Sequence, residues 1–200
     1  MRLSQTCVVL GILAVPALAS AQIKQPGAHS LYSAELEPHL VVQWNDYAPC
    51  SSDAFGPGFR AAIPFLANGP IPRINNNMAI GFGLDWAHAG INSGCNAYYF
   101  NGQNYGNSFS ADVFTLPVVV QWNFFLLPKI SVFGEGGLVF EHRRWDGGNL
   151  CNGNFCGAAS TDNTVEPSLS VGGRFLVTDS VGFLLRLGYP YLSAGVSILL

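Results

Sequence analysis

Large apolar residues alternate with small or acidic ones through residues 78–86. A period of two is typical of a β-strand whose two faces meet different environments. Glycines and an acid on the second face favour a wet, cramped interior over open water, which predicts the lumen of a small membrane barrel. The apolar face comprises Met78, Ile80, Phe82, Leu84 and Trp86, and the other face Ala79, Gly81, Gly83 and Asp85.

The same alternation predicts eight strands in all. The pattern therefore indicates an all-β protein, an eight-stranded antiparallel up-and-down transmembrane β-barrel. Residues 89–110 are expected to form a long loop, and Tyr189-Pro190-Tyr191 a short turn. Pro117 lies inside the fourth strand, where its missing donor should break the pairing unless a bulge accommodates it. The predicted strands are residues 36–47, 59–65, 78–88, 111–123, 130–145, 165–177, 181–188 and 192–200.

The composition agrees with a membrane barrel. The chain is 49% hydrophobic and only 10% charged, yet beyond its N-terminal region no apolar run reaches the roughly 20 residues of a spanning helix. Closed barrels are the other structure that can span a bilayer, so we expect the cell outer membrane. The formal net charge of -3 supplies no basic patch, and nucleic acid is not an expected partner.

The N-terminus reads as a secretory signal peptide over residues 1–21, with Arg2, an apolar run and the small residues Ala19-Ser20-Ala21. Residues 22–34 are then expected to be a periplasmic segment and residues 35–200 the barrel. With both termini periplasmic, the longest connections fall on the extracellular side.

Four cysteines follow the predicted signal peptide, all in connections assigned to the extracellular side. An even number in an exported chain favours disulfides over metal ligands, although four cysteines allow three pairings. The interpretation adopted is Cys50 with Cys95 and Cys151 with Cys156. No metal or cofactor is predicted.

Charged residues recur on the predicted inner faces. An uncompensated charge in a narrow interior costs several kcal/mol, and eight strands enclose a space that side chains just fill. We therefore predict a salt-bridged, largely plugged lumen. A small pore is the alternative, and a channel for hydrophobic molecules is disfavoured by the charges. The predicted lumen network is Arg60, Asp85, Glu135, Glu141, Arg143, Glu166, Arg174 and Arg186, with Glu37 on the same faces.

The residues argue against three further interpretations. A barrel enzyme modifying lipid A would need a His beside a Ser near the outer rim; His88 and His142 lie there, with Ser93 in the following loop, but no His-x-Ser pair occurs on a strand. No catalytic residue is therefore predicted. A secreted, lipocalin-like barrel with inverted faces would crowd Phe, Trp and Leu from every strand into one small interior. Calcium at Asp146 and Asp162 would have too few carboxylates.

The C-terminus carries the sharpest motif. Ser193, Gly195 and Ile198 fit a polar-x-Gly-x-x-apolar-x-aromatic frame, with Leu200 at the aromatic position. In this and in its strand pattern the chain resembles the small OmpA-like outer-membrane β-barrel superfamily. The resemblance implies a structural or surface-interaction protein whose partners are outer-membrane lipid, lipopolysaccharide and, during insertion, the barrel-assembly machinery. It implies no oligomeric state.

Overall fold

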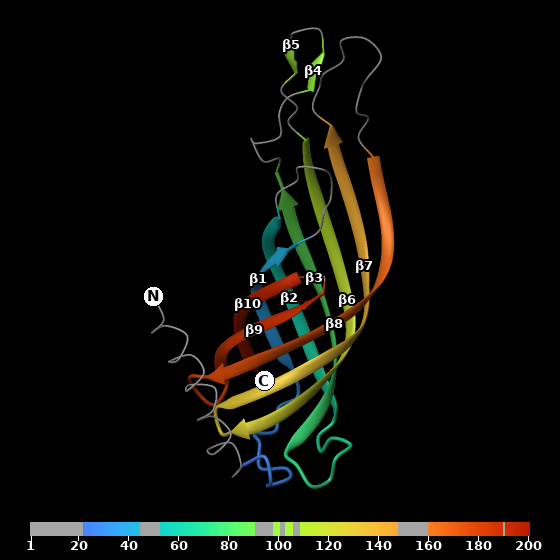
Figure 1. The fold of residues 1–200 in the computed structure, drawn as a ribbon. Helices are drawn as coiled ribbons and strands as arrows, with labels where there is room; N and C mark the ends of the chain where they lie inside the picture. The colour runs from blue at the N-terminus through green and yellow to red at the C-terminus, as the bar shows by residue number, and fades with distance from the viewer. Residues whose placement is uncertain are drawn as a thin grey trace, which may run out of the picture.

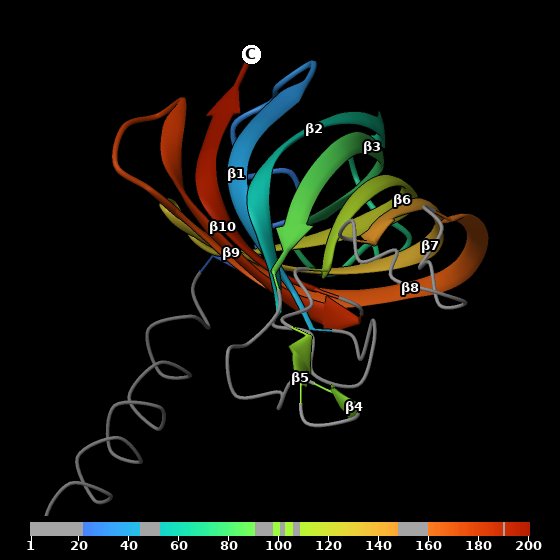
Figure 2. The same cartoon turned by 90° about the horizontal axis from the view of Figure 1, so that it is seen from above.

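Eight antiparallel strands close into a barrel in the order β1-β10-β9-β8-β7-β6-β3-β2 (Figures 1 and 2). This confirms the predicted fold class. The strands are β1 (Glu35–Gln43), β2 (Ala54–Leu66), β3 (Asn76–Ala89), β6 (Phe109–Leu127), β7 (Ile130–Gly147), β8 (Ser160–Leu176), β9 (Val181–Tyr189) and β10 (Tyr191–Leu199). The computed structural model describes residues 22–44, 53–90, 98–100, 103–105, 109–147, 160–189 and 191–200.

The wall of the barrel is uneven in height. Strands β6, β7 and β8 have 19, 18 and 17 residues, whereas β1, β9 and β10 have 9 each. Figure 1 shows β6 to β8 rising far beyond β1, β9 and β10, with β3 nearly reaching the height of β6, and we call the extension formed by β6 to β8 the tall wall. It stands at the loop end, where β1 connects to β2, β3 to β6 and β7 to β8. The opposite, turn end carries the β2–β3, β6–β7 and β8–β9 turns and Leu200.

Strand bounds differ from the sequence prediction at several points, most clearly at the starts of β2 and β8 and within the predicted loop. Strand β2 begins at Ala54, five residues early, because its Gly56-Pro57-Gly58 stretch is strand and not turn. Strand β8 likewise begins at Ser160. Within residues 89–110, predicted to be loop throughout, β4 (Tyr98–Phe100) and β5 (Gln103–Tyr105) pair as a short hairpin. The intervening Asn-Gly dipeptide is a hairpin signal that could have predicted it.

The strand prolines lie at positions where the hydrogen-bonded ladder to one neighbouring strand is interrupted or has ended. Strands β3 and β6 keep one register across Pro117 but have no paired positions at Leu116 and Pro117, while the ladder to β7 is continuous. Pairing with β3 is therefore interrupted at Pro117, and a local gap without a bulge or register shift accommodates the missing donor. Pro38 sits at a similar gap between β1 and β10, Pro64 at a register shift, and Pro167 on β8 beyond the end of β9.

Side chains alternate between an apolar exterior and a mostly polar interior. Most of the exposed large hydrophobics lie on the outward positions of β1, β2, β3, β6, β7, β8 and β9, whereas most buried charged and amide side chains point inward. Inward glycines make room. A methyl group on Gly58 would collide with Asp85 and His39, and one on Gly172 with Phe133. Within the described ranges, no helix is long and apolar enough to cross a membrane.

Candidate functional site

Arg186 holds together the charged centre of the lumen. From β9 it donates through Nη2 to Glu37 Oε2 at 2.6 Å and to Glu135 Oε1 at 3.0 Å, and its Nε lies 2.9 Å from Glu135 Oε2. Its Nη1 donates to Ser193 Oγ at 3.2 Å. Ser170 also donates to Glu135, at 2.6 Å. Arg186 is only 1% exposed, so this pairing is what allows its charge to be buried.

Arg60 and His39 extend the network across the barrel. Arg60 on β2 lies 3.3 Å from Glu135 Oε2 and 3.5 Å from Asp85 Oδ2, and it donates to the Tyr191 hydroxyl. The His39 ring has Nε2 2.9 Å from Asp85 Oδ1 and Nδ1 2.9 Å from the Glu37 carbonyl oxygen. We call Glu37, His39, Arg60, Asp85, Glu135 and Arg186 the central network.

A second buried ion pair lies nearer the turn end. Arg174 on β8 grips the Glu35 carboxylate through Nε, at 2.7 Å, and through Nη2, and it donates to Ser131 Oγ at 3.1 Å. The Ser197 hydroxyl also donates to Glu35. The Phe133 ring lies beside both groups, because the guanidinium carbons of Arg174 and Arg186 lie 5.9 and 5.3 Å from its centroid.

Towards the loop end, the lumen contains a set of buried apolar side chains, which we call the apolar layer, and a partly exposed charged cluster among them. In the cluster, Glu141 accepts from Gln43 at 3.2 Å and pairs with Arg143. Arg143 Nη2 lies 3.8 Å from Glu166, which also accepts from the Tyr189 hydroxyl at 3.4 Å. The apolar layer is the buried set Val41, Ala54, Ala87, Ala89, Ala111, Val113, Val139 and Tyr191.

Amide side chains close the turn end. Asn123 donates to Asn77 at 2.8 Å, and Asn77 donates to the Tyr32 hydroxyl at 3.2 Å. Burial raises the pKa of the Tyr32 phenol above its usual value, so the group stays neutral. His29 stacks on Phe125 with ring centroids 4.1 Å apart. Residues 22–34 therefore pack against the turn end.

The structure brings most of the predicted lumen residues into two groups. Arg60, Asp85, Glu135 and Arg186 lie in the central network, and Glu141, Arg143 and Glu166 in the loop-end cluster; Arg174 pairs separately with Glu35. Glu35, His39 and Tyr191 were missed. Extending the inward alternation of β1 and β10 by one step would have found Glu35 and Tyr191, since each continues its strand's inner face.

The residues considered for catalysis lie on the outer surface. His88 Nδ1 is 2.9 Å from Asp112 Oδ1, to which the Trp86 indole also donates at 3.2 Å. His142 Nδ1 is 2.7 Å from Asn163 Oδ1. In the part of the chain that is described, no group of three or more His, Cys, Asp or Glu side chains is placed to hold a metal ion. Ser93, the side chain of Asp146 and the four cysteines lie outside that part.

The orientation of the two faces decides what kind of barrel this is. Leu169 and Val171 on the outside are 69% and 63% exposed, while Arg186 and Glu37 inside are 1% exposed. A soluble lipocalin-like barrel needs the reverse arrangement, so that alternative is wrong. An apolar outer band around a polar interior, with an even number of antiparallel strands, suits a bilayer. The fold is that of a small outer-membrane β-barrel.

Comparisons with known proteins find likenesses of shape for this barrel. No family model and no curated protein sequence matches the chain. The attachment invasion locus protein Ail of Yersinia pestis is similar at 11% identity and a TM-score of 0.48, over 83% of this chain and 97% of that one. Neisserial surface protein A is similar at 14% identity and a TM-score of 0.47, over 84% and 96%. A de novo designed transmembrane β-barrel is similar at 11% identity and a TM-score of 0.45, over 86% and 98%.

Proposed function

We propose that this outer-membrane barrel is a non-conducting surface-interaction protein with no enzymatic role, whose tall wall projects from the cell. Two observations together carry the proposal: buried ion pairs cross the lumen, and the sheet extends beyond one end of the barrel. The loop end is extracellular, and residues 22–34 lie in the periplasm.

Three buried groups in the lumen support a plug. They are the Glu35–Arg174 ion pair, the central network and the apolar layer. Opening a path would separate buried charges, which costs several kcal/mol for each. Purified protein in planar bilayers is expected to show no steady conductance. Stable single-channel steps on the nanosiemens scale would contradict the plug.

The free edge of β8 supports surface contact. Strand β9 ends opposite Leu169, and residues 160–168 have no described backbone partner on that side. The amide of Leu176 donates towards β7 and that of Val177 towards β9, so by alternation the amides of Thr161 and Asn163 point to the free edge. An edge of this kind pairs with an extended polypeptide.

A matched pair of variants tests the edge. The double variant Thr161→Pro with Asn163→Pro removes two backbone amide donors from the free edge, where Pro167 already lacks one. The double variant Thr161→Ala with Asn163→Ala removes the side chains but keeps both backbone amides. Cells displaying the intact protein should be retained on immobilised casein, an unfolded polypeptide, more than cells without it. We expect retention to disappear with the proline pair and to persist with the alanine pair. Equal retention by both variants, or no retention by the intact protein, would contradict edge pairing.

Other parts of the proposal concern maturation and lie mostly outside the described residues. Residues 1–21 act as a cleaved signal peptide, and Cys50 joins Cys95 and Cys151 joins Cys156 once the chain is exported. Ser193, Gly195, Ile198 and Leu200 on the last strand form the signal for the barrel-assembly machinery. Lipopolysaccharide surrounds the outer half of the barrel.

A further inference from the structure

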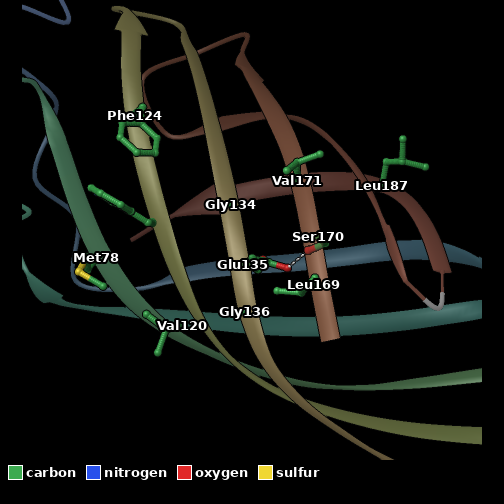
Figure 3. A pocket seen from close by; sticks show the side chains of 11 residues that line it. Met78, Val120, Phe124, Gly134, Glu135, Gly136, Leu169, Ser170, Val171 and Leu187 are labelled. Carbon is green, nitrogen blue, oxygen red and sulfur yellow. Dashed lines mark hydrogen bonds between the residues drawn. The ribbon is translucent and has the colours of Figure 1, made fainter. Parts of the chain in front are cut away.

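Two adjoining apolar grooves hollow the lipid-facing wall near the turn end, each of about 620 Å³. The first lies over Gly134 and Gly136 of β7, between β6 and β8. In Figure 3, Phe124 and Val120 stand on one side of these glycines, and Leu169 and Val171 on the other. The second groove lies over Gly173 of β8 and reaches from β7 to β10. Gly134 and Gly173 are diagonal neighbours across the β7–β8 ladder, so the two floors meet.

The floor glycines differ from those that face the lumen. A methyl group on Gly134 would meet nothing within 4 Å, and on Gly136 or Gly173 it would make ordinary contacts at 3.5 or 3.8 Å. Packing of the barrel therefore does not require glycine at these three positions, although glycine weakens a strand. Because Gly134, Gly136 and Gly173 carry no side chains, the two grooves remain open on the lipid-facing surface.

A cation lies at the turn end of the second groove. Lys129 directly precedes the groove residue Ile130, and its Nζ donates to the Val177 carbonyl oxygen at 3.0 Å, just beyond the groove residue Phe175. Among the described residues Lys129 has no carboxylate partner. Its charge is therefore available to an anion at the membrane surface.

We propose that the paired grooves bind one anionic diacyl phospholipid of the periplasmic leaflet, with one acyl chain in each groove and the phosphate at Lys129. The inference rests on the barrel spanning the membrane and not on the surface contact of the tall wall. A second copy of the chain fits less well, because a two-fold interface would set hollow against hollow. The charge at the end of the grooves favours an anionic headgroup over a zwitterionic one.

Native mass spectrometry of the folded protein in detergent tests the site with phosphatidylglycerol and phosphatidylcholine at equal concentration. We expect a bound phosphatidylglycerol, favoured about fivefold over phosphatidylcholine, and loss of that preference in Lys129→Gln, since one cation near an anionic surface is worth a factor of this size. Gly134→Leu with Gly173→Leu fills both grooves and should lower adducts of either lipid several-fold. The control Val118→Leu adds the same kind of bulk to β6 outside the grooves and should leave them unchanged.

Each other outcome contradicts the proposal. Equal adducts in the groove-filling and control variants would place the lipid elsewhere on the barrel. Equal binding of phosphatidylglycerol and phosphatidylcholine by the intact protein would show that Lys129 does not contact the headgroup. A dimer that the groove-filling variant abolishes would make a second copy the occupant. Since Lys129→Gln changes only an exposed turn residue, the headgroup test stands even if the double leucine variant fails to fold.

Discussion

Replacing Arg186 with methionine tests whether the central network holds the barrel together. Methionine keeps an unbranched apolar side chain beside Phe133 but removes the charge that faces Glu37 at 2.6 Å and Glu135 at 2.9 Å. Glu135 retains Arg60 at 3.3 Å, whereas Glu37 loses the only ion-pair partner it has among the described residues. Leaving a buried charge without its partner costs about 3–5 kcal/mol. That is a large part of the about 5–15 kcal/mol that usually stabilises a folded protein.

Urea unfolding in lipid vesicles, followed by the migration of unheated samples on a gel, measures the loss. Arg144→Met is the matched control, because Arg144 is exposed and has no ion pair in the described structure; we expect it to change the free energy of unfolding by less than about 0.5 kcal/mol. Adding Glu37→Gln to Arg186→Met should restore part of the stability, since it removes the stranded charge. If Arg186→Met unfolds at the same urea concentration as Arg144→Met, the lumen is hydrated and the reasoning fails.

Two other substitutions test packing and the turn end. Gly58→Ala drives a methyl group into Asp85 and should cost about 1–3 kcal/mol, whereas Gly134→Ala, which meets open space, should not destabilise; equal thermal stability of the two variants would contradict the crowding argument. Asn76→Ala removes one bond from the Trp122 indole and two to backbone carbonyls. We expect it to cost about 2–3 kcal/mol in the same urea assay, and a change below about 0.5 kcal/mol would show that water replaces those bonds.

The sequence predicts strand identity well and strand length poorly. Alternation located Asp85 and Glu135 on inner faces because a period of two is a local property of the backbone. It missed the first five residues of β2, since Gly56-Pro57-Gly58 resembles a turn until the bulk of His39 and Asp85 opposite is known. It did not decide how the barrel accommodates Pro117, because that depends on which neighbouring strand the missing amide would face.

The ion-pair partners inside the lumen could not be predicted from the sequence either, because they also depend on contacts between strands. Alternation predicts that Arg174 and Arg186 point inward. Strand register and barrel closure decide their partners: Arg174 pairs with Glu35, and Arg186 pairs with Glu37 and Glu135. Alternation along the chain by itself determined an inside-out, eight-stranded barrel with a charged interior. Only the tertiary structure decided which charges meet, how high each strand rises and where glycines leave grooves, because these follow from contacts between strands far apart in the sequence.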